Sequence, residues 1–178
     1  NPFEPGVVTA LLSLVPTDGQ FHDLPGEYGQ TLDELQKFAK KSRKTSGNPG
    51  GAGVLDVGAR FPVSLAGQRF SVVEKIGEGA FGAVFKAEDR GVRGEDEDED
   101  EDEDLDLDDD DASVVALKVV RPRNLWEYHV LRRLHQSLPV PLRPSIVLPH
   151  ALYAFRDESF LVLEYAPHGT LLSVVNKA

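Results

Sequence analysis

The segment Ile76-Gly77-Glu78-Gly79-Ala80-Phe81-Gly82-Ala83-Val84 carries three glycines in the spacing G-x-G-x-x-G-x-V. Glycine lacks a Cβ, so a backbone of this composition can lie close over the phosphates of a nucleotide. The residues that follow the glycines, Ala83 to Ala87, have the composition of a strand. The segment therefore predicts the turn of a β-hairpin, whereas a dinucleotide-binding fold places a helix after its glycines.

A second motif, Val115-Ala116-Leu117-Lys118, follows downstream. A single strand lysine is most often a surface residue whose stem packs while its ammonium group stays in water. Together with the glycines, however, Lys118 is placed to supply a fixed positive charge to phosphates. The order and residue types of the two motifs resemble the glycine-rich loop and the V-A-I-K strand of protein kinases, and this resemblance implies ATP as the nucleotide.

The kinase resemblance extends to Phe160-Leu161-Val162-Leu163-Glu164-Tyr165-Ala166, which is similar to the strand and hinge against which adenine docks. By this resemblance Leu163 is the gatekeeper, and the Glu164 carbonyl and the Ala166 amide contact the adenine edge. Apolar strand residues usually belong to a core, so this assignment depends on the motifs that precede it. The implied ATP-binding residues are Ile76, Gly77, Glu78, Gly79, Ala80, Phe81, Gly82, Val84, Ala116, Lys118, Leu163, Glu164 and Ala166.

Glu127 is the expected ion-pair partner of Lys118, and both residues are assigned to catalysis. It is the sole acidic residue of the helical segment from Trp126 to Leu138. Alternatively, the stretch Asn124 to Glu127 fits the N-cap and N3 positions of a helix, and the glutamate would then form part of a cap.

Two helices are predicted before the glycine-rich segment. Pro5 to Val15 has apolar residues at helical spacing, and Thr31-Leu32-Asp33-Glu34 has the form of a capping box. The stripe of the second helix consists of Leu32, Leu35, Phe38 and Ala39. Its end is basic (Lys40, Lys41, Arg43 and Lys44), and positive charge is favourable at a helix C-terminus. Alternatively, these residues form a nuclear-import signal or a phosphate-binding patch.

Five strands are predicted after a Gly-rich linker at Thr45 to Gly53: 69–76, 82–88, 114–120, 150–155 and 159–164. A helix that begins at Asn124 separates the third strand from the fourth, with one face formed by Trp126, Val130, Leu131, Leu134 and Leu138. The fold class is therefore α+β. The pattern is that of a kinase N-lobe at 61–178, with a five-stranded antiparallel sheet, preceded by a helical extension at 1–60.

The net charge of −11 is concentrated in one insert, Glu95 to Asp111, which contains 15 acidic residues interrupted only by two leucines. Such a run repels itself and has little apolar area to bury, so we expect a disordered loop between two strands. An alternative role is electrostatic attraction of basic partners. Without the insert, the chain is mildly basic.

The composition sets further bounds. No apolar run approaches the ~20 residues of a membrane helix, and no secretory signal opens the chain, so we expect no membrane association. The absence of cysteine excludes disulfides and cysteine-based zinc sites. The start at Asn1 and the lack of methionine indicate an excised fragment.

The stretch from Lys118 to Glu127, K-V-V-R-P-R-N-L-W-E, resembles the Bub family of mitotic spindle-checkpoint kinases, as does His168-Gly169-Thr170-Leu171-Leu172. The Asn1-Pro2-Phe3 start with its helical extension is similar to the segment that wraps the N-lobe in that family. The resemblance implies a serine/threonine kinase that uses ATP and Mg²⁺. It also implies a location in the nucleus at kinetochores, a histone tail as substrate and checkpoint proteins as partners, without direct nucleic-acid binding.

The chain ends at Ala178 and contains neither an H-x-D catalytic loop nor a D-F-G metal site. The Mg²⁺ ligands and the catalytic base are therefore expected in a C-lobe absent from this chain, and the fragment alone is predicted to be inactive. A pseudokinase and a non-enzymatic checkpoint scaffold are the alternatives. The intact glycines, Lys118 and Glu127 favour the enzyme.

Overall fold

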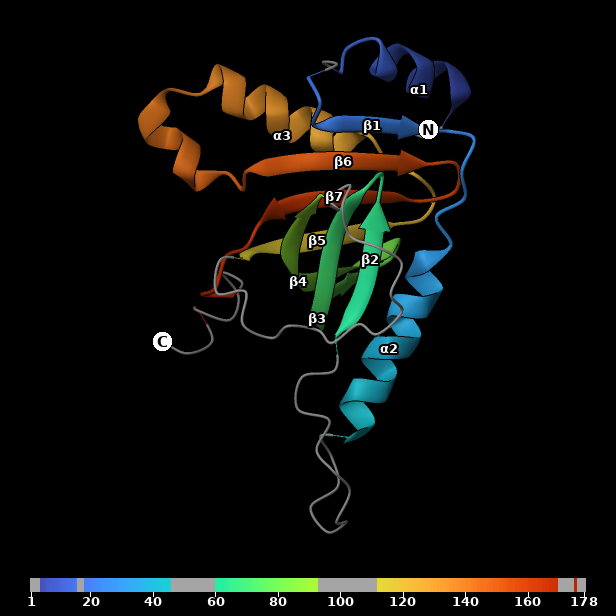
Figure 1. Ribbon diagram of the computed structural model, residues 1–178. Helices are drawn as coiled ribbons and strands as arrows, with labels where there is room; N and C mark the ends of the chain where they lie inside the picture. Colours follow the sequence, from blue (N-terminus) through green and yellow to red (C-terminus); the bar gives the residue numbers. More distant parts are fainter. Residues whose placement is uncertain (1–3, 16–17, 46–59, 93–111, 170–174, 176–178) are drawn as a thin grey trace.

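The structure is a computed structural model that describes residues 4–15, 18–45, 60–92, 112–169 and 175. The described residues form a seven-stranded sheet in the order β1-β6-β7-β5-β4-β3-β2 (Figure 1). Neighbouring strands are antiparallel except β1 and β6, which are parallel. The strands are β1 (Phe21–Leu24), β2 (Phe61–Leu65), β3 (Gln68–Gly79), β4 (Gly82–Val92), β5 (Ser113–Val120), β6 (Pro149–Phe155) and β7 (Ser159–Glu164).

The five predicted strands correspond to β3 to β7, and the α+β fold class is confirmed. The prediction of five strands was nevertheless too low, because β1 and β2 add one strand at each edge of the sheet. β2 alternates exposed Pro62 and Ser64 with buried Val63 and Leu65, and it turns into β3 through two residues of positive φ, Ala66 and Gly67. This alternation is the normal signature of a half-buried strand.

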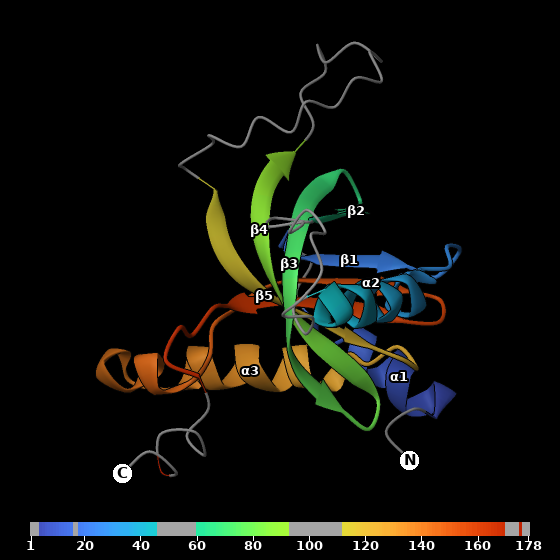
Figure 2. The same ribbon diagram turned by 90° about the horizontal axis from the view of Figure 1, so that it is seen from below.

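Helices cover both faces of the sheet: α1 (Pro5–Leu12), α2 (Thr31–Thr45) and α3 (Trp126–Ser137), with a short 3₁₀ helix at Val140–Ser145. The predicted α2 stripe is confirmed, since Leu32, Leu35 and Ala39 are buried and Phe38 packs against the same core. In Figure 2, α1 and α3 lie along one side of the sheet, and α2 lies apart from them.

Alternate residues of the central strands enter two separate apolar cores. Leu117 of β5 and Val162 of β7 pack in the core under α2. Ala116 and Leu163, their neighbours in the chain, pack with α1 and α3 on the opposite face. The candidate site residues of β5 and β7 therefore lie on the face that carries α3.

Two predictions about helices were wrong in detail. Thr31 does not cap α2 as a capping box requires, because its hydroxyl donates to the Gly29 carbonyl while Glu158 accepts the first amides of the helix. On α3, Val130 and Leu134 are 46% and 37% exposed. The buried side chain of this helix is Tyr128, which packs in the same core cluster as Leu152 of β6 and Leu161 of β7, whereas Trp126 and Leu131 of the predicted face are partly buried against that cluster.

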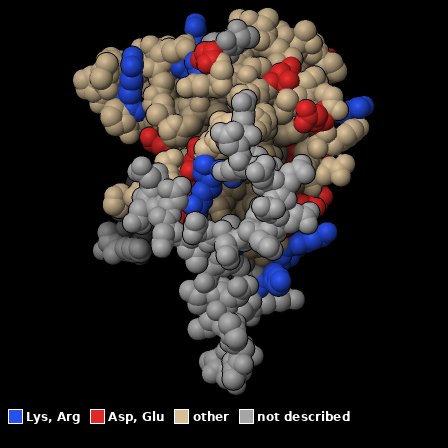
Figure 3. Space-filling model, viewed as in Figure 1, with Lys and Arg blue, Asp and Glu red and all other residues tan. Residues whose placement is uncertain are grey.

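Several predictions fall on residues that the structure does not describe: the acidic insert at 95–111, the linker at 46–53, the side chains of Arg43 and Lys44, and the G-T-L-L residues 170–172. Among the coloured residues of Figure 3, acidic and basic side chains are interspersed over the face shown. Within the described ranges, no helix is long and apolar enough to cross a membrane.

Candidate nucleotide-binding site

The glycine-rich segment forms a β-hairpin. β3 ends at Gly79, β4 begins at Gly82, and Ala80 and Phe81 make the turn between these two paired residues. The side chains of Ile76 and Phe81 are exposed. The hairpin therefore presents backbone and a few apolar side chains to solvent, with Val84 directly opposite Gly77 on the returning strand.

The three glycines of this hairpin have different surroundings. A Cβ on Gly82 would overlap the Val119 carbonyl oxygen of β5. A Cβ on Gly77 would lie 3.6 Å from the Val84 Cβ, an ordinary contact, and one on Gly79 would meet nothing within 4 Å. Packing against the described residues therefore explains Gly82 and explains neither Gly77 nor Gly79, of which Gly79 is the more open. A bare backbone at Gly79 suits a surface that a ligand approaches closely.

Lys118 and Glu127 are brought together in the structure. The Lys118 Nζ lies 2.8 Å and 2.6 Å from the two carboxylate oxygens of Glu127. Asn124 Oδ1 accepts a hydrogen bond from the Trp126 amide at the start of α3. The Glu127 carboxylate contacts the lysine. The two side chains are 31% and 34% exposed, and a pair this exposed contributes roughly 1 kcal/mol or less to stability.

The apolar part of the candidate site lies beside this ion pair. Ala116 is opposite Leu163 across β5 and β7, and Val84 is opposite Lys118 across β4 and β5. Ala116 and Leu163 belong to the core cluster on the face that carries α3, and the partly buried Val84 packs against it. Glu164 ends β7, donates its amide to the Leu148 carbonyl at 2.9 Å, and is followed by the exposed Ala166.

Sequence reasoning missed Lys86 and Tyr165. Lys86 lies two residues after Val84 on β4, and its Nζ is 5.4 Å from the centre of the Tyr165 ring. This cation–π contact joins β4 to the segment that follows β7. The period of two from Val84 could have placed Lys86 on the same face as Val84, but no sequence signal links Lys86 to Tyr165.

The N-terminal extension fixes the position of α3, another contribution that the sequence did not reveal. Arg132 of α3 forms an ion pair with Asp18, and its Nη1 donates to Gln20 Oε1 at 2.6 Å and to the Tyr128 hydroxyl at 2.9 Å. Burial raises the pKa of Tyr128, although the bond from Arg132 opposes that rise. Because these contacts hold α3 against the sheet, they also hold Glu127 near Lys118.

This combination of a mixed sheet, a connecting helix and a lysine–glutamate pair is that of a protein-kinase-like lobe. A solved structure with a similar fold is the crystal structure of the BubR1 kinase domain, with a TM-score of 0.51 and 21% identity. The similarity covers 84% of this chain and 40% of that one. At this identity it shows the fold alone.

The lobe resembles the Bub family of checkpoint kinases, as its sequence motifs predicted. The chain is 32% identical, over 99% of its length, to the mitotic checkpoint serine/threonine-protein kinase BUB1 of Arabidopsis thaliana. It is 27% identical, over 84% of its length, to the spindle assembly checkpoint serine/threonine-protein kinase BUB1 of Saccharomyces cerevisiae. The chain spans 28% and 12% of these two relatives. No family model matches it.

Proposed function

We propose that this chain is the ATP-binding part of a serine/threonine protein kinase of the mitotic spindle checkpoint, which acts at kinetochores in the nucleus. The observation that carries the proposal is the Lys118–Glu127 ion pair on the sheet face beside the glycine-rich hairpin. The names of the relatives support the kinase class and the checkpoint. Protein substrates, with a histone tail among them, and checkpoint partners are part of the same proposal.

The residues present suit ATP. The open backbone at Gly79 leaves room for phosphates, and Lys118 offers a cation held in place by Glu127. Val84 and Ala116 add the small apolar side chains that suit contact with an adenine ring. Bound ATP would supply the phosphoryl group that is transferred. The roles of this chain are then to cover, orient and neutralise the nucleotide.

Mg²⁺ is part of the proposed activity, but its ligands are not assigned within this chain. Among the described residues, no group of three or more His, Asp or Glu side chains is arranged to hold a metal ion. We therefore assign no step of the reaction to a metal ion.

The test is a titration of ATP into the full-length protein, followed by a transfer assay on a histone-tail peptide. We expect saturable ATP binding and incorporation of phosphate on serine or threonine. A folded protein that binds no ATP would contradict the proposal. Binding without transfer would instead identify a pseudokinase or scaffold.

The glycine hairpin gives a matched pair of variants. Gly79→Ala should leave thermal stability unchanged, because its Cβ enters open space, and should weaken ATP binding by obstructing the phosphates. Gly82→Ala should lower stability by about 1–3 kcal/mol, because its Cβ overlaps the Val119 carbonyl. Thermal denaturation and ATP titration of both variants check this. Unchanged ATP affinity in folded Gly79→Ala would show that the phosphates do not approach that residue.

A further inference from the structure

Arg121 is the first residue after β5, and its backbone contacts the tip of the glycine-rich hairpin. The Arg121 amide donates to the Phe81 carbonyl at 2.8 Å. Just before it, Val120 pairs with Gly82, and the Val119 carbonyl occupies the space where a Gly82 Cβ would stand. The position of the hairpin tip is therefore set by the backbone at 119–121.

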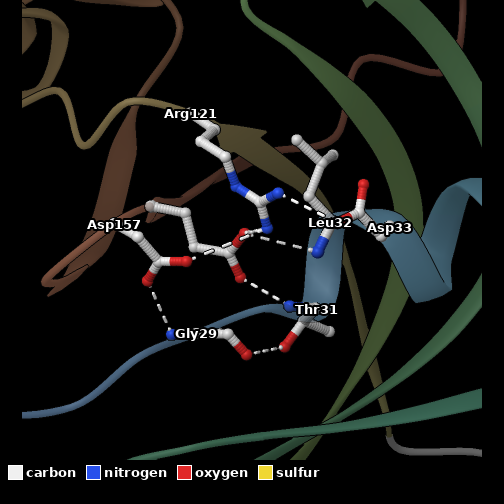
Figure 4. Close-up of polar contacts among 7 residues, drawn as sticks. Gly29, Thr31, Leu32, Asp33, Arg121 and Asp157 are labelled. Carbon is white, nitrogen blue, oxygen red and sulfur yellow. Dashed lines mark hydrogen bonds and ion pairs between the residues drawn. The ribbon is translucent and has the colours of Figure 1, made fainter.

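The side chain of Arg121 extends to the N-terminal extension (Figure 4). Its Nη2 is 2.7 Å from Glu158 Oε2, and its Nη1 is 2.9 Å from Asp33 Oδ2 of α2. Glu158 is fully buried, and its carboxylate also accepts the amides of Thr31, at 2.7 Å, and Leu32, at 3.4 Å. One carboxylate thus joins Arg121 to the first turn of α2, where negative charge is favoured.

Arg121 has three acidic neighbours, since Asp157 Oδ2 also lies 3.9 Å from its Nη2. The two that accept hydrogen bonds from Arg121, Asp33 and Glu158, differ in the strength of that bond. Asp33 is 63% exposed, so its bond to the guanidinium competes with water. Glu158 is removed from water, and a charge-assisted bond in such a place is the stronger one. The link from α2 to Arg121 therefore passes mainly through Glu158.

We propose that Arg121 is a positioning residue that couples the docking of α2 to the position of the glycine-rich hairpin. With α2 docked on Glu158, Arg121 is held and its amide keeps the hairpin tip against the end of β5. When α2 leaves, Arg121 loses Asp33, and Glu158 loses both the cover of α2 and the two amides that fix its carboxylate. Arg121 is then held less firmly, and the hairpin tip is loosened. The coupling predicts a higher affinity for ATP when α2 is docked, and this consequence rests on the proposed function.

The neighbouring Arg123 offers a matched control. Its Nη2 pairs with Asp23 of β1 at 2.8 Å, and its amide donates to the Asp157 carbonyl at 3.1 Å. It therefore joins the same connecting segment to β1 and to the turn before β7, and neither of these partners belongs to the hairpin. A general loosening of this segment would affect both arginine variants, whereas the proposed coupling depends on Arg121.

The experiment compares Arg121→Gln with Arg123→Gln in the full-length protein. Hydrogen exchange of residues 76–84, measured without nucleotide, should accelerate by about five-fold or more in Arg121→Gln and remain unchanged in Arg123→Gln. The KM for ATP should rise by a similar factor in Arg121→Gln, and by more than kcat falls. Arg121→Lys, which keeps the charge and loses the planar fork, should recover part of both effects.

Unchanged exchange of the hairpin in Arg121→Gln, with faster exchange in α2, would overturn the coupling and leave the proposed function standing. Faster hairpin exchange in Arg121→Gln, together with a wild-type protein that binds no ATP, would support the coupling and contradict the proposed function. If Arg121→Gln does not fold, Glu158→Gln gives the same test, because it removes the charge that Arg121 contacts. Unaltered hairpin exchange in that variant would equally refute the proposal.

Discussion

Replacement of Lys118 by Met should reduce phosphoryl transfer by the full-length protein by about 10²-fold or more, because a fixed charge at the phosphates is lost. The fold should survive. Lys118 is about one third exposed, and its ion pair with Glu127 contributes little to stability. Steady-state kinetics with a histone-tail peptide, together with a thermal melt of the same preparation, would measure both effects.

Two further variants make this result interpretable. Glu127→Gln should lower activity less than Lys118→Met, because in the proposed function the lysine contacts the phosphate and the glutamate only orients the lysine. Lys86→Met removes the lysine that lies over Tyr165, and it should have a smaller effect on transfer than Lys118→Met. Activity retained in Lys118→Met would mean that another cation neutralises the phosphates of ATP, and the assignment of Lys118 would be wrong.

Glu158→Ala should destabilise the protein by about 3 kcal/mol, as much as the upper end of the range expected for Gly82→Ala. Its carboxylate is fully buried and accepts bonds from Thr31, Leu32 and Arg121. Removal leaves two amides of α2 and one guanidinium group without this partner. The value is at the lower end for a buried pair, because Arg121 is 34% exposed and can turn towards water. Chemical denaturation would measure the loss.

Asp33→Ala is the control for this prediction. Asp33 also contacts Arg121, but it is 63% exposed, so its loss should change stability by no more than about 0.5 kcal/mol. Similar losses in the two variants would show that burial of Glu158 does not govern the strength of this contact. Glu158→Gln, which keeps the shape of the side chain, should fall between them.

Local patterns predicted the part of the fold that lies around the glycine-rich hairpin. The strands β3, β4, β5 and β7 show apolar residues in short runs bounded by turn residues, and the geometry of paired strands then places Val84, Ala116 and Lys118 on one face. The Lys118–Glu127 contact followed from the composition of one helix. These features depend on residues close together in the sequence or on a motif with fixed spacing.

The features that the sequence did not predict depend on distant contacts. β1 has four residues, one of them the charged Asp23, and it exists because it pairs with β6 from far along the chain. A charged residue in a turn, such as Glu158, is expected to be exposed. Its burial results from the contact with the start of α2, which is distant in the sequence. The buried face of α3 was predicted in part, since Trp126 and Leu131 pack against the core. Val130 and Leu134 are exposed instead, and the fully buried residue is Tyr128, whose hydroxyl is bonded to Arg132.

The parallel strand β1 also protects the sheet from unwanted association. β6 has four consecutive buried residues, Leu152 to Phe155, and without β1 its backbone donors and acceptors would form an open apolar edge. Such edges recruit strands from other molecules. β1 closes this edge with a strand of four residues that includes the charged Asp23, which makes it a poor template itself. At the other edge, Pro62 lies within β2 and offers no amide donor to another strand. The extension therefore contributes to solubility as well as to the arrangement of the site.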